Sequence, residues 1–241
     1  MKKKIFAVSD IHGHFTEFKD VLDASGFENG NSEHLLVFCG DLFDRGTENM
    51  KVLQFFERTD NGIMVRGNHE DLLLKVFDDG RLNPHNFITG SVSTITYFFG
   101  KYAIDGVDNS IDFSGKTRTV DRITDLILSM CDYYETEHYI FTHGWLPNRD
   151  GVILDDWKNA SVPEWEKARF TKWTDVYTGV APIAGKTVVC GHMPTFFAKR
   201  FDAGRDDGDA GPFYGNGIIA IDGGTYDTGK VNIVMLEDEV L

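Results

Sequence analysis

Residues 35–46 have the sequence LLVFCGDLFDRG, in which an apolar run leads directly into charged residues between two glycines. The apolar run is typical of a buried strand, and the glycines and charged residues are typical of a turn at its end. The same order occurs at residues 4–13 (KIFAVSDIHG) and 62–70 (GIMVRGNHE). Apolar residues at helical spacing occupy the two segments between these strands and predict helices over residues 15–24 and 50–56. The first seventy residues therefore predict a βαβαβ unit and a parallel sheet.

The polar residues that follow these strands are expected to meet, because ligands of open α/β sheets gather at the carboxyl ends of parallel strands. Two later clusters, 141–144 (FTHG) and 190–192 (CGH), repeat the same order. Together the strand ends supply six side chains that can bind metal ions: Asp10, His12, Asp41, Asn68, His143 and His192. Imidazole and carboxylate ligands without a thiolate suit manganese, iron or zinc. The sequence therefore predicts a metal site, for which we expect manganese, with iron or zinc as alternatives.

The rest of the chain is predicted to complete one domain over residues 1–241, with a cap or insertion around 79–118. Helices are expected at 91–99, 120–131 and 163–170, and strands at 139–142, 186–190, 218–221 and 231–236. These last strands predict a second sheet or its edge. The Gly- and Asp-rich segment 202–217 is predicted to be a flexible surface loop.

The composition limits the possible partners. The 241 residues include 24 Lys and Arg but 38 Asp and Glu, which gives a formal net charge of −14. Such a chain repels nucleic-acid phosphates and anionic lipid, so we expect no extended nucleic-acid binding and no membrane association. The apolar run at the N-terminus is too short for a secretory signal, and three scattered cysteines suit a reducing compartment. We therefore expect a soluble, cytoplasmic protein, whose oligomeric state the sequence does not indicate.

The motif set DxHG, GDxxDRG, GNHE, HG and GH resembles that of the PPP-type metallophosphatases of the calcineurin-like superfamily, in particular their bacterial and phage serine/threonine protein phosphatases. The resemblance implies a four-layer α/β/β/α fold with two β-sheets sandwiched between helices. It also implies two divalent metal ions per chain. Residues matching Asp10, His12 and Asp41 would hold the first, those matching Asn68, His143 and His192 the second, and Asp41 would bridge them.

The same resemblance implies the catalytic residues. A metal-bridging hydroxide would attack the phosphorus directly. His69 would be the general acid, Asp44 would orient it, and Arg45 would bind the phosphate. A second phosphate-binding arginine is expected by analogy, and Arg169 is our candidate.

One departure bears on the substrate. Phosphodiesterase and nuclease branches of the superfamily carry GHxH, whereas this sequence has Pro194 in place of the second histidine. We therefore expect the protein to hydrolyse phosphomonoesters, with a phosphorylated protein or a small phosphoester as substrate. Our first hypothesis is a serine/threonine protein phosphatase. The alternative is a symmetrical dinucleoside polyphosphate (diadenosine tetraphosphate) hydrolase. A third hypothesis is an inactive metal-binding interaction module. The retention of Asp44 and His69 argues against this hypothesis.

Overall fold

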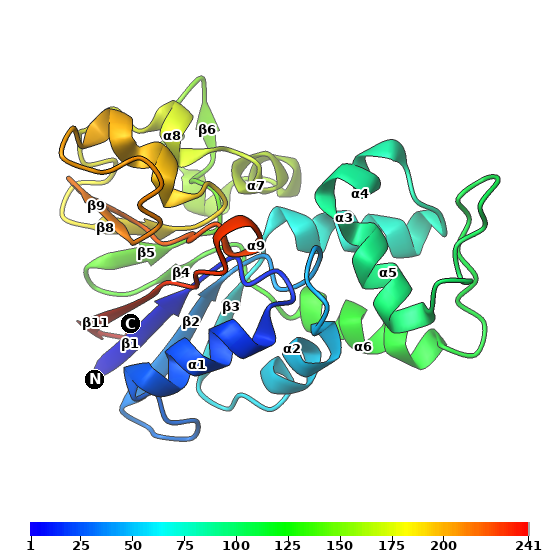
Figure 1. Ribbon diagram of the computed structural model, residues 1–241. Helices are drawn as coiled ribbons and strands as arrows, with labels where there is room; N and C mark the ends of the chain where they lie inside the picture. The colour runs from blue at the N-terminus through cyan, green and yellow to red at the C-terminus, as the bar shows by residue number, and fades with distance from the viewer. Residues whose placement is uncertain (241) are drawn as a thin grey trace.

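The structure, a computed structural model, describes residues 1–240, and its strands form two large sheets and one small one (Figure 1). In the first sheet the order is β11-β1-β2-β3, where β1, β2 and β3 run parallel and β11 pairs with β1 in the antiparallel direction. In the second the order is β4-β5-β8-β10-β9, and β6 pairs with β7. The strands are β1 (Lys2–Val8), β2 (His34–Cys39), β3 (Gly62–Val65), β4 (Tyr134–Glu135), β5 (Tyr139–Phe141), β6 (Asn148–Arg149), β7 (Val152–Ile153), β8 (Thr187–Cys190), β9 (Phe213–Gly215), β10 (Ile218–Ala220) and β11 (Ile233–Glu239).

Helices lie outside both sheets, with α1 and α2 along the first and α7 and α8 beside the second (Figure 1). The α-helices are α1 (Phe15–Ser25), α2 (Asn49–Phe56), α3 (Asn68–Asp79), α4 (Pro84–Thr89), α5 (Ser91–Phe99), α6 (Thr117–Leu128), α7 (Val162–Arg169), α8 (Trp173–Val176) and α9 (Thr225–Thr228). Two 3-10 helices are η1 (Trp157–Asn159) and η2 (Thr195–Phe201).

The alternating direction of side chains along the central strands explains how the sheets and helices form layers. In β1, Phe6 and Val8 pack against the helices on the outer face, while Ile5 and Ala7 point to the second sheet. Because successive side chains of a strand point to opposite faces, a strand buried on both faces must be apolar throughout. This is why the sheet strands appear as continuous apolar runs. The predicted arrangement of helices, two facing sheets and helices is confirmed.

The C-terminal third differs in two respects from the prediction. The last predicted strand returns to the first sheet as β11, beside β1, instead of closing the second sheet. Segment 202–217 is not loop throughout, because Phe213–Gly215 forms β9 and pairs with β10. The guanidinium of Arg205, which is nearly buried, donates hydrogen bonds to the carbonyls of Asp209, Gly211 and Pro212. These hydrogen bonds satisfy buried carbonyls and connect Arg205 to residues 209–212 within the segment.

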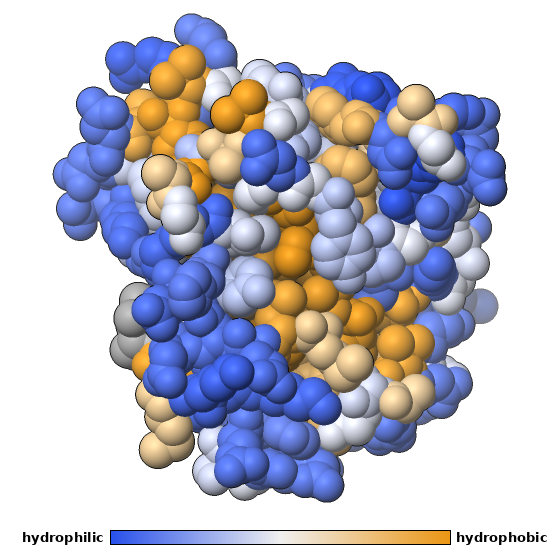
Figure 2. All heavy atoms as spheres, turned by 90° about the vertical axis from the view of Figure 1, so that its left-hand side faces the viewer, coloured by the Kyte–Doolittle hydropathy of each residue, from blue (hydrophilic) through white to orange (hydrophobic). Residues whose placement is uncertain are grey.

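The segment around 79–118 contains α4, α5 and a long loop, and it lies beside α3 and α6 at the right of Figure 1. Helix α5 spans the predicted residues, whereas α4 was not predicted; Asn83 caps it and Pro84 occupies its first turn. That this segment acts as a cap stays a prediction. Within residues 1–240, no helix has the length and hydrophobicity to cross a bilayer. Hydrophilic side chains cover much of the side shown in Figure 2, with a band of hydrophobic ones in its middle.

Candidate active site

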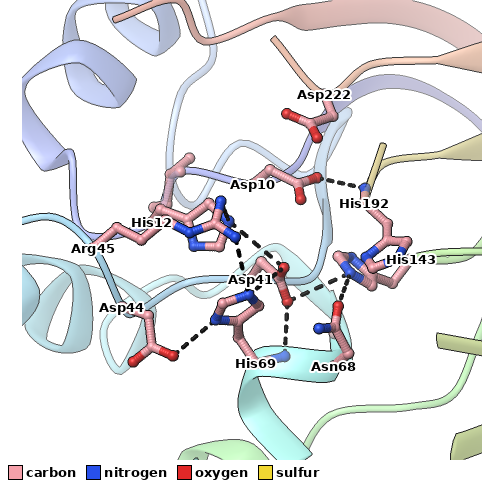
Figure 3. Close-up of polar contacts among 12 residues, drawn as sticks. Asp10, His12, Asp41, Asp44, Arg45, Asn68, His69, His143, His192 and Asp222 are labelled. Atoms are coloured by element: carbon pink, nitrogen blue, oxygen red, sulfur yellow. Dashed lines mark hydrogen bonds and ion pairs between the residues drawn. The ribbon is translucent and has the colours of Figure 1, made fainter. Parts of the chain in front are cut away.

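The six predicted metal ligands come together where the two sheets meet. Asp10, Asp41 and Asn68 follow β1, β2 and β3, while His143 and His192 follow β5 and β8. Figure 3 shows Asp41 in the middle, with the imidazoles of His12 and His69 on one side and those of His143 and His192 on the other. Parallel strands in both sheets explain this convergence.

The backbone is strained at this point. Eight non-glycine residues within residues 1–240 have positive φ, and six of them belong to the predicted site: Asp10, His12, Asp41, Asp44, Arg45 and His192. Such conformations cost free energy and cluster at functional sites. The adjacent glycines leave room for the ligands, because a Cβ atom at Gly67 would collide with the carboxylate of Asp41, and one at Gly191 with that of Asp10.

Asp41 links two groups of side chains that could each hold a cation. Its Oδ2 lies 3.6 Å from Nε2 of His12, and its Oδ1 lies 3.4 Å from Nε2 of His143. Potential ligand atoms of His12, Asp41 and His69 lie within 4.8 Å of one another, as do those of Asp41, His143 and His192. A carboxylate with one oxygen toward each group has the arrangement expected of a bridging ligand.

The imidazoles of His12 and His143 are oriented by backbone carbonyls. Nδ1 of His12 lies 2.9 Å from the carbonyl of Phe43, and Nδ1 of His143 lies 2.7 Å from that of Cys39. When Nδ1–H donates to a carbonyl, the lone pair is left on Nε2, which is the usual state of a metal-ligating histidine. Oδ1 of Asn68 lies 2.8 Å from Nε2 of His143, which brings the amide oxygen into the same group.

The neutral histidines and closely spaced carboxyl groups at this position favour the binding of divalent cations. Burial lowers the pKa of His12 and His143, and burial together with the neighbouring His143 lowers that of His192 to about 3, so all three are neutral at pH 7. Burial and the charges of Asp222 and Asp41 raise the pKa of Asp10. Neutral imidazoles and closely spaced carboxyl groups are ligands that a cation would stabilise.

His69 differs from the other three histidines. Its Nδ1 lies 2.8 Å from Oδ2 of Asp44, and both side chains are buried. Burial alone would lower the pKa of His69, but the charge of Asp41 and the hydrogen bond and charge of Asp44 outweigh it and raise the pKa. His69 therefore holds a proton more readily than the three neutral imidazoles, as a general acid requires.

Arg45 lies over this group of side chains. Its Nη1 is 3.1 Å from Nε2 of His12, its Nη2 is 3.4 Å from Nε2 of His69, and its guanidinium carbon is 5.9 Å from the ring centre of Tyr226. The side chains enclose a cleft of about 490 Å³, which Lys172 also lines. The cleft thus combines candidate cation ligands around Asp41, the hydrogen-bonded pair of His69 and Asp44, and two cationic side chains.

A comparison with known protein families identifies the family of this chain. Residues 3–219 match the family described as calcineurin-like phosphoesterases. The chain belongs to this family. The fold and the class of enzyme expected from the sequence, a phosphoester hydrolase, are those of the calcineurin-like phosphoesterases.

The curated relatives are more specific. A symmetrical bis(5'-nucleosyl)-tetraphosphatase of Nitrosospira multiformis is 42% identical over 73 residues, and one of Aromatoleum aromaticum is 38% identical over 73 residues. Each match covers 30% of this chain and 26% of the relative. The chain therefore matches about a quarter of the length of these relatives, which are named as tetraphosphatases and not as the protein phosphatases expected from the motifs.

Solved structures show the fold alone. A candidate diadenosine tetraphosphatase has a TM-score of 0.55 at 16% identity and covers 99% of this chain and 94% of its own. A protein serine/threonine phosphatase from Saccharomyces cerevisiae has a TM-score of 0.53 at 16% identity, over 99% of this chain and 80% of its own. The same fold is thus found in proteins named for different substrates.

Arg169, the predicted second phosphate ligand, is engaged elsewhere in the structure. Its Nε donates to Asp71 at 2.6 Å and its Nη1 to Asp132 at 2.7 Å, and the side chain is 2% exposed. Its neighbour Phe170 lines the cleft, whereas Arg169 is not among the lining residues. Phosphate binding by Arg169 stays a prediction. Its ion pairs with Asp71 and Asp132 give this residue a structural role as well.

Two buried carboxyl groups of the site escaped sequence reasoning. Glu70 accepts hydrogen bonds from the backbone amides of Asp41, Leu42 and Gly67, so it ties the loop after β2 to the start of α3. Asp222 follows β10, lines the cleft and lies near Asp10 (Figure 3). Burial and Asp41 raise the pKa of Asp222 to about 7. The signal was present for Asp222, because IIAIDGG repeats the order of an apolar strand followed by Asp and Gly.

Helix α5 also reaches the site. Ser91 donates a hydrogen bond to Oδ2 of Asp44 at 2.9 Å, and Thr94 donates to Oδ1 at 2.7 Å. The backbone amide of Asp44 in turn donates to the hydroxyl of Thr94 at 2.9 Å. The carboxylate that orients His69 is therefore held by a helix about 50 residues further along the chain, which no local pattern indicates.

Proposed function

We propose that this chain is a dinuclear-metal phosphoesterase that hydrolyses dinucleoside polyphosphates symmetrically, between the two central phosphates. One observation carries the chemistry: Asp41 lies between two groups of histidines, and Nδ1 of one of them, His69, lies 2.8 Å from the carboxylate of Asp44, while the other three are suited to ligate cations. The curated relatives support the substrate, since those reported above are named symmetrical tetraphosphatases.

The residues that would hold the cations are Asp10, His12 and Asp41 at the first position and Asp41, Asn68, His143 and His192 at the second. Bound as a pair, divalent cations would lower the pKa of a water so that it attacks phosphorus at neutral pH, and would offset the charge of the phosphates.

The chain's own residues do the rest. Arg45 and Lys172 bind phosphate oxygens and orient the phosphorus toward the incoming water. As the new P–O bond forms, the bond from phosphorus to the bridging oxygen breaks, and that oxygen takes the proton of Nε2 of His69. Asp44 holds Nδ1 throughout and stabilises the charged imidazole. The products are two nucleoside diphosphates.

A serine/threonine protein phosphatase is the second candidate. The motif set from DxHG to GH favours it, as does Pro194 in place of the second histidine of GHxH, which leaves three protein ligands for the first cation. The relatives support the tetraphosphatase better. The third reading, an inactive metal-binding module, would not require the buried pair of Asp44 and His69.

The test compares both substrates on one manganese-loaded preparation. We expect diadenosine tetraphosphate to be converted to ADP with a higher kcat/KM than phosphoserine peptides. Exclusive formation of AMP and ATP would contradict symmetrical cleavage, and faster turnover of the peptides would favour the protein phosphatase. Metal analysis of the protein purified from its own cells tests the expectation of manganese, and fractionation of those cells tests the cytoplasmic location.

A further inference from the structure

A second concavity lies next to the cleft that contains the candidate metal ligands, which we call the metal cleft. The proposed mechanism gives this second concavity no role. It encloses about 540 Å³, a volume in the range of ligand pockets. Arg45, Ile88 and Tyr226 line both concavities, so the two adjoin each other at Arg45. We call this second concavity the aromatic pocket.

The lining of the aromatic pocket is mainly apolar. Phe87 on α4, Tyr97 on α5 and Tyr226 on α9 contribute aromatic rings that are 51%, 43% and 57% exposed. Ile88 and Val92 add aliphatic surface. Large apolar side chains left in contact with water around a concave surface mark a ligand site more often than single exposed residues do.

A few polar groups lie among these apolar side chains. Thr47, Ser93 and Thr96 contribute hydroxyl groups to the wall, and no carboxylate lines the pocket. The wall therefore offers flat apolar surface together with hydrogen-bonding groups but no negative charge. This combination suits a neutral, planar heterocycle with polar edges.

We propose that the aromatic pocket binds one nucleobase of the substrate, an inference that rests on the proposed function. A nucleotide has its charged phosphates at one end and its aromatic base at the other. The metal cleft suits the phosphates, and the adjoining aromatic pocket suits the base. Arg45 stands at the boundary, close to the metal ligand His12 on one side and over the ring of Tyr226 on the other. The phosphate chain passes Arg45, and the base stacks on the aromatic side chains.

Helix α5 connects this pocket to catalysis. Gly90, Val92, Ser93, Thr96 and Tyr97 line the pocket from α5 and its N-cap. Ser91 and Thr94, from the same helix, hold the carboxylate of Asp44. A base seated in the pocket would thus pack against the element that positions the acid dyad, so that base binding and protonation of the leaving group depend on one helix.

The experiment measures binding of ADP and of pyrophosphate to the manganese-loaded protein by calorimetry, in the wild type and in Phe87→Ala and Tyr97→Ala. Stacking of a base on an aromatic side chain contributes on the order of 1–3 kcal/mol, so each variant should bind ADP about tenfold more weakly. Binding of pyrophosphate, which has no base, should change less than twofold. Ser93→Trp, which fills the pocket from α5, should weaken ADP binding in the same way.

Tyr214→Ala is the matched control, because Tyr214 is an exposed tyrosine on β9 outside both concavities. It should bind ADP as the wild type does, and thermal unfolding should show that all variants are folded. The proposal is overturned if the folded pocket variants bind ADP like the wild type, or if they lose affinity only for phosphopeptides.

This result is separable from the proposed function. If the wild type fails to cleave diadenosine tetraphosphate but the pocket variants still lose ADP affinity, the tetraphosphatase is wrong and the base pocket stands. If the wild type forms ADP from diadenosine tetraphosphate and the variants keep its KM and its ADP affinity, the function stands and the base pocket is wrong.

Discussion

The metal cleft and the aromatic pocket adjoin at Arg45 but are built in different ways. Strand ends supply the candidate ligands of the cleft, and three of them are nearly fully buried; Asp10, Asp41 and His143 are 2%, 2% and 0% exposed. The aromatic pocket is built by helices α4, α5 and α9, and its rings are about half exposed.

The contrast indicates where chemistry and where substrate specificity would reside in this molecule. Buried groups held by several hydrogen bonds keep fixed positions, which bond breaking requires. Exposed side chains on short helices can be exchanged without disturbing the core, so they suit the recognition of one part of a substrate. Changes in the cleft should therefore abolish turnover of every substrate, while changes in the pocket should alter the preference among substrates.

The largest effect is expected for Asp41→Asn. Asn at this position loses the charge that faces both cation positions, so metal binding at both should weaken together and activity should fall by more than a thousandfold on all substrates. Metal content by elemental analysis and kcat by steady-state assay measure the two effects. Full wild-type turnover at one metal per chain would contradict a dinuclear centre.

A smaller and substrate-dependent loss is expected for His69→Asn. Folding and metal content should be retained, while kcat falls by about 10² to 10⁴ because the leaving group is no longer protonated. The loss should be greater on phosphoserine peptides, whose alkoxide is a poor leaving group, than on p-nitrophenyl phosphate. Asp44→Asn should show the same asymmetry more mildly. Equal losses on both substrates, with chemistry rate-limiting, would exclude the acid role.

Removal of the hydroxyl groups that hold Asp44 should have an intermediate effect. In Ser91→Ala combined with Thr94→Val, the carboxylate loses two hydrogen bonds, each worth about 1.5 to 3 kcal/mol when one partner is charged. We expect kcat to fall about tenfold on phosphoserine peptides, with KM nearly unchanged and a smaller loss on p-nitrophenyl phosphate. Ser129→Ala is the matched control, because the Ser129 hydroxyl donates to the carbonyl of Leu126 at the end of α6 and the residue lines neither concavity. Equal losses on both substrates would assign Ser91 and Thr94 a purely structural role.

The smallest effect on activity is expected at Asp238, a buried carboxylate outside both concavities. Burial opposes its charged form, but hydrogen bonds from His138 and Thr136 outweigh burial and lower its pKa to about 2. Because the folded-state pKa is below that of the unfolded chain, its stabilisation is fully present above about pH 4 and is lost as the pH falls toward 2.

Asp238→Asn should therefore lower the free energy of unfolding at pH 7 by about 1 kcal/mol, because its partner His138 is 62% exposed and water screens the pair. It should also flatten the dependence of stability on pH below 4, with kcat unchanged. Urea unfolding at pH 3 and pH 7 measures the stability. An equal free-energy difference between wild type and variant at the two pH values would show that the carboxylate charge does not stabilise the fold.

The six candidate ligand positions, the candidate acid pair of Asp44 and His69 and most central elements could be predicted from the sequence, because each follows from a local pattern. An apolar run followed by Asp, His and Gly fixes a strand and its end without reference to distant residues, and Gly62–Val65 and Ser91–Phe99 have the predicted limits. Parallel packing then brings the strand ends together by geometry alone.

Contacts between segments that are distant in the chain are visible only in the three-dimensional structure. Thr94 and Asp44 lie 50 positions apart, and Arg169 and Asp71 lie 98 apart. Whether such side chains meet depends on how helices pack, for which apolar periodicity gives a buried face but no partner. The same holds for β11 beside β1 and for the aromatic rings of α4, α5 and α9, which sequence alone left as unrelated surface residues.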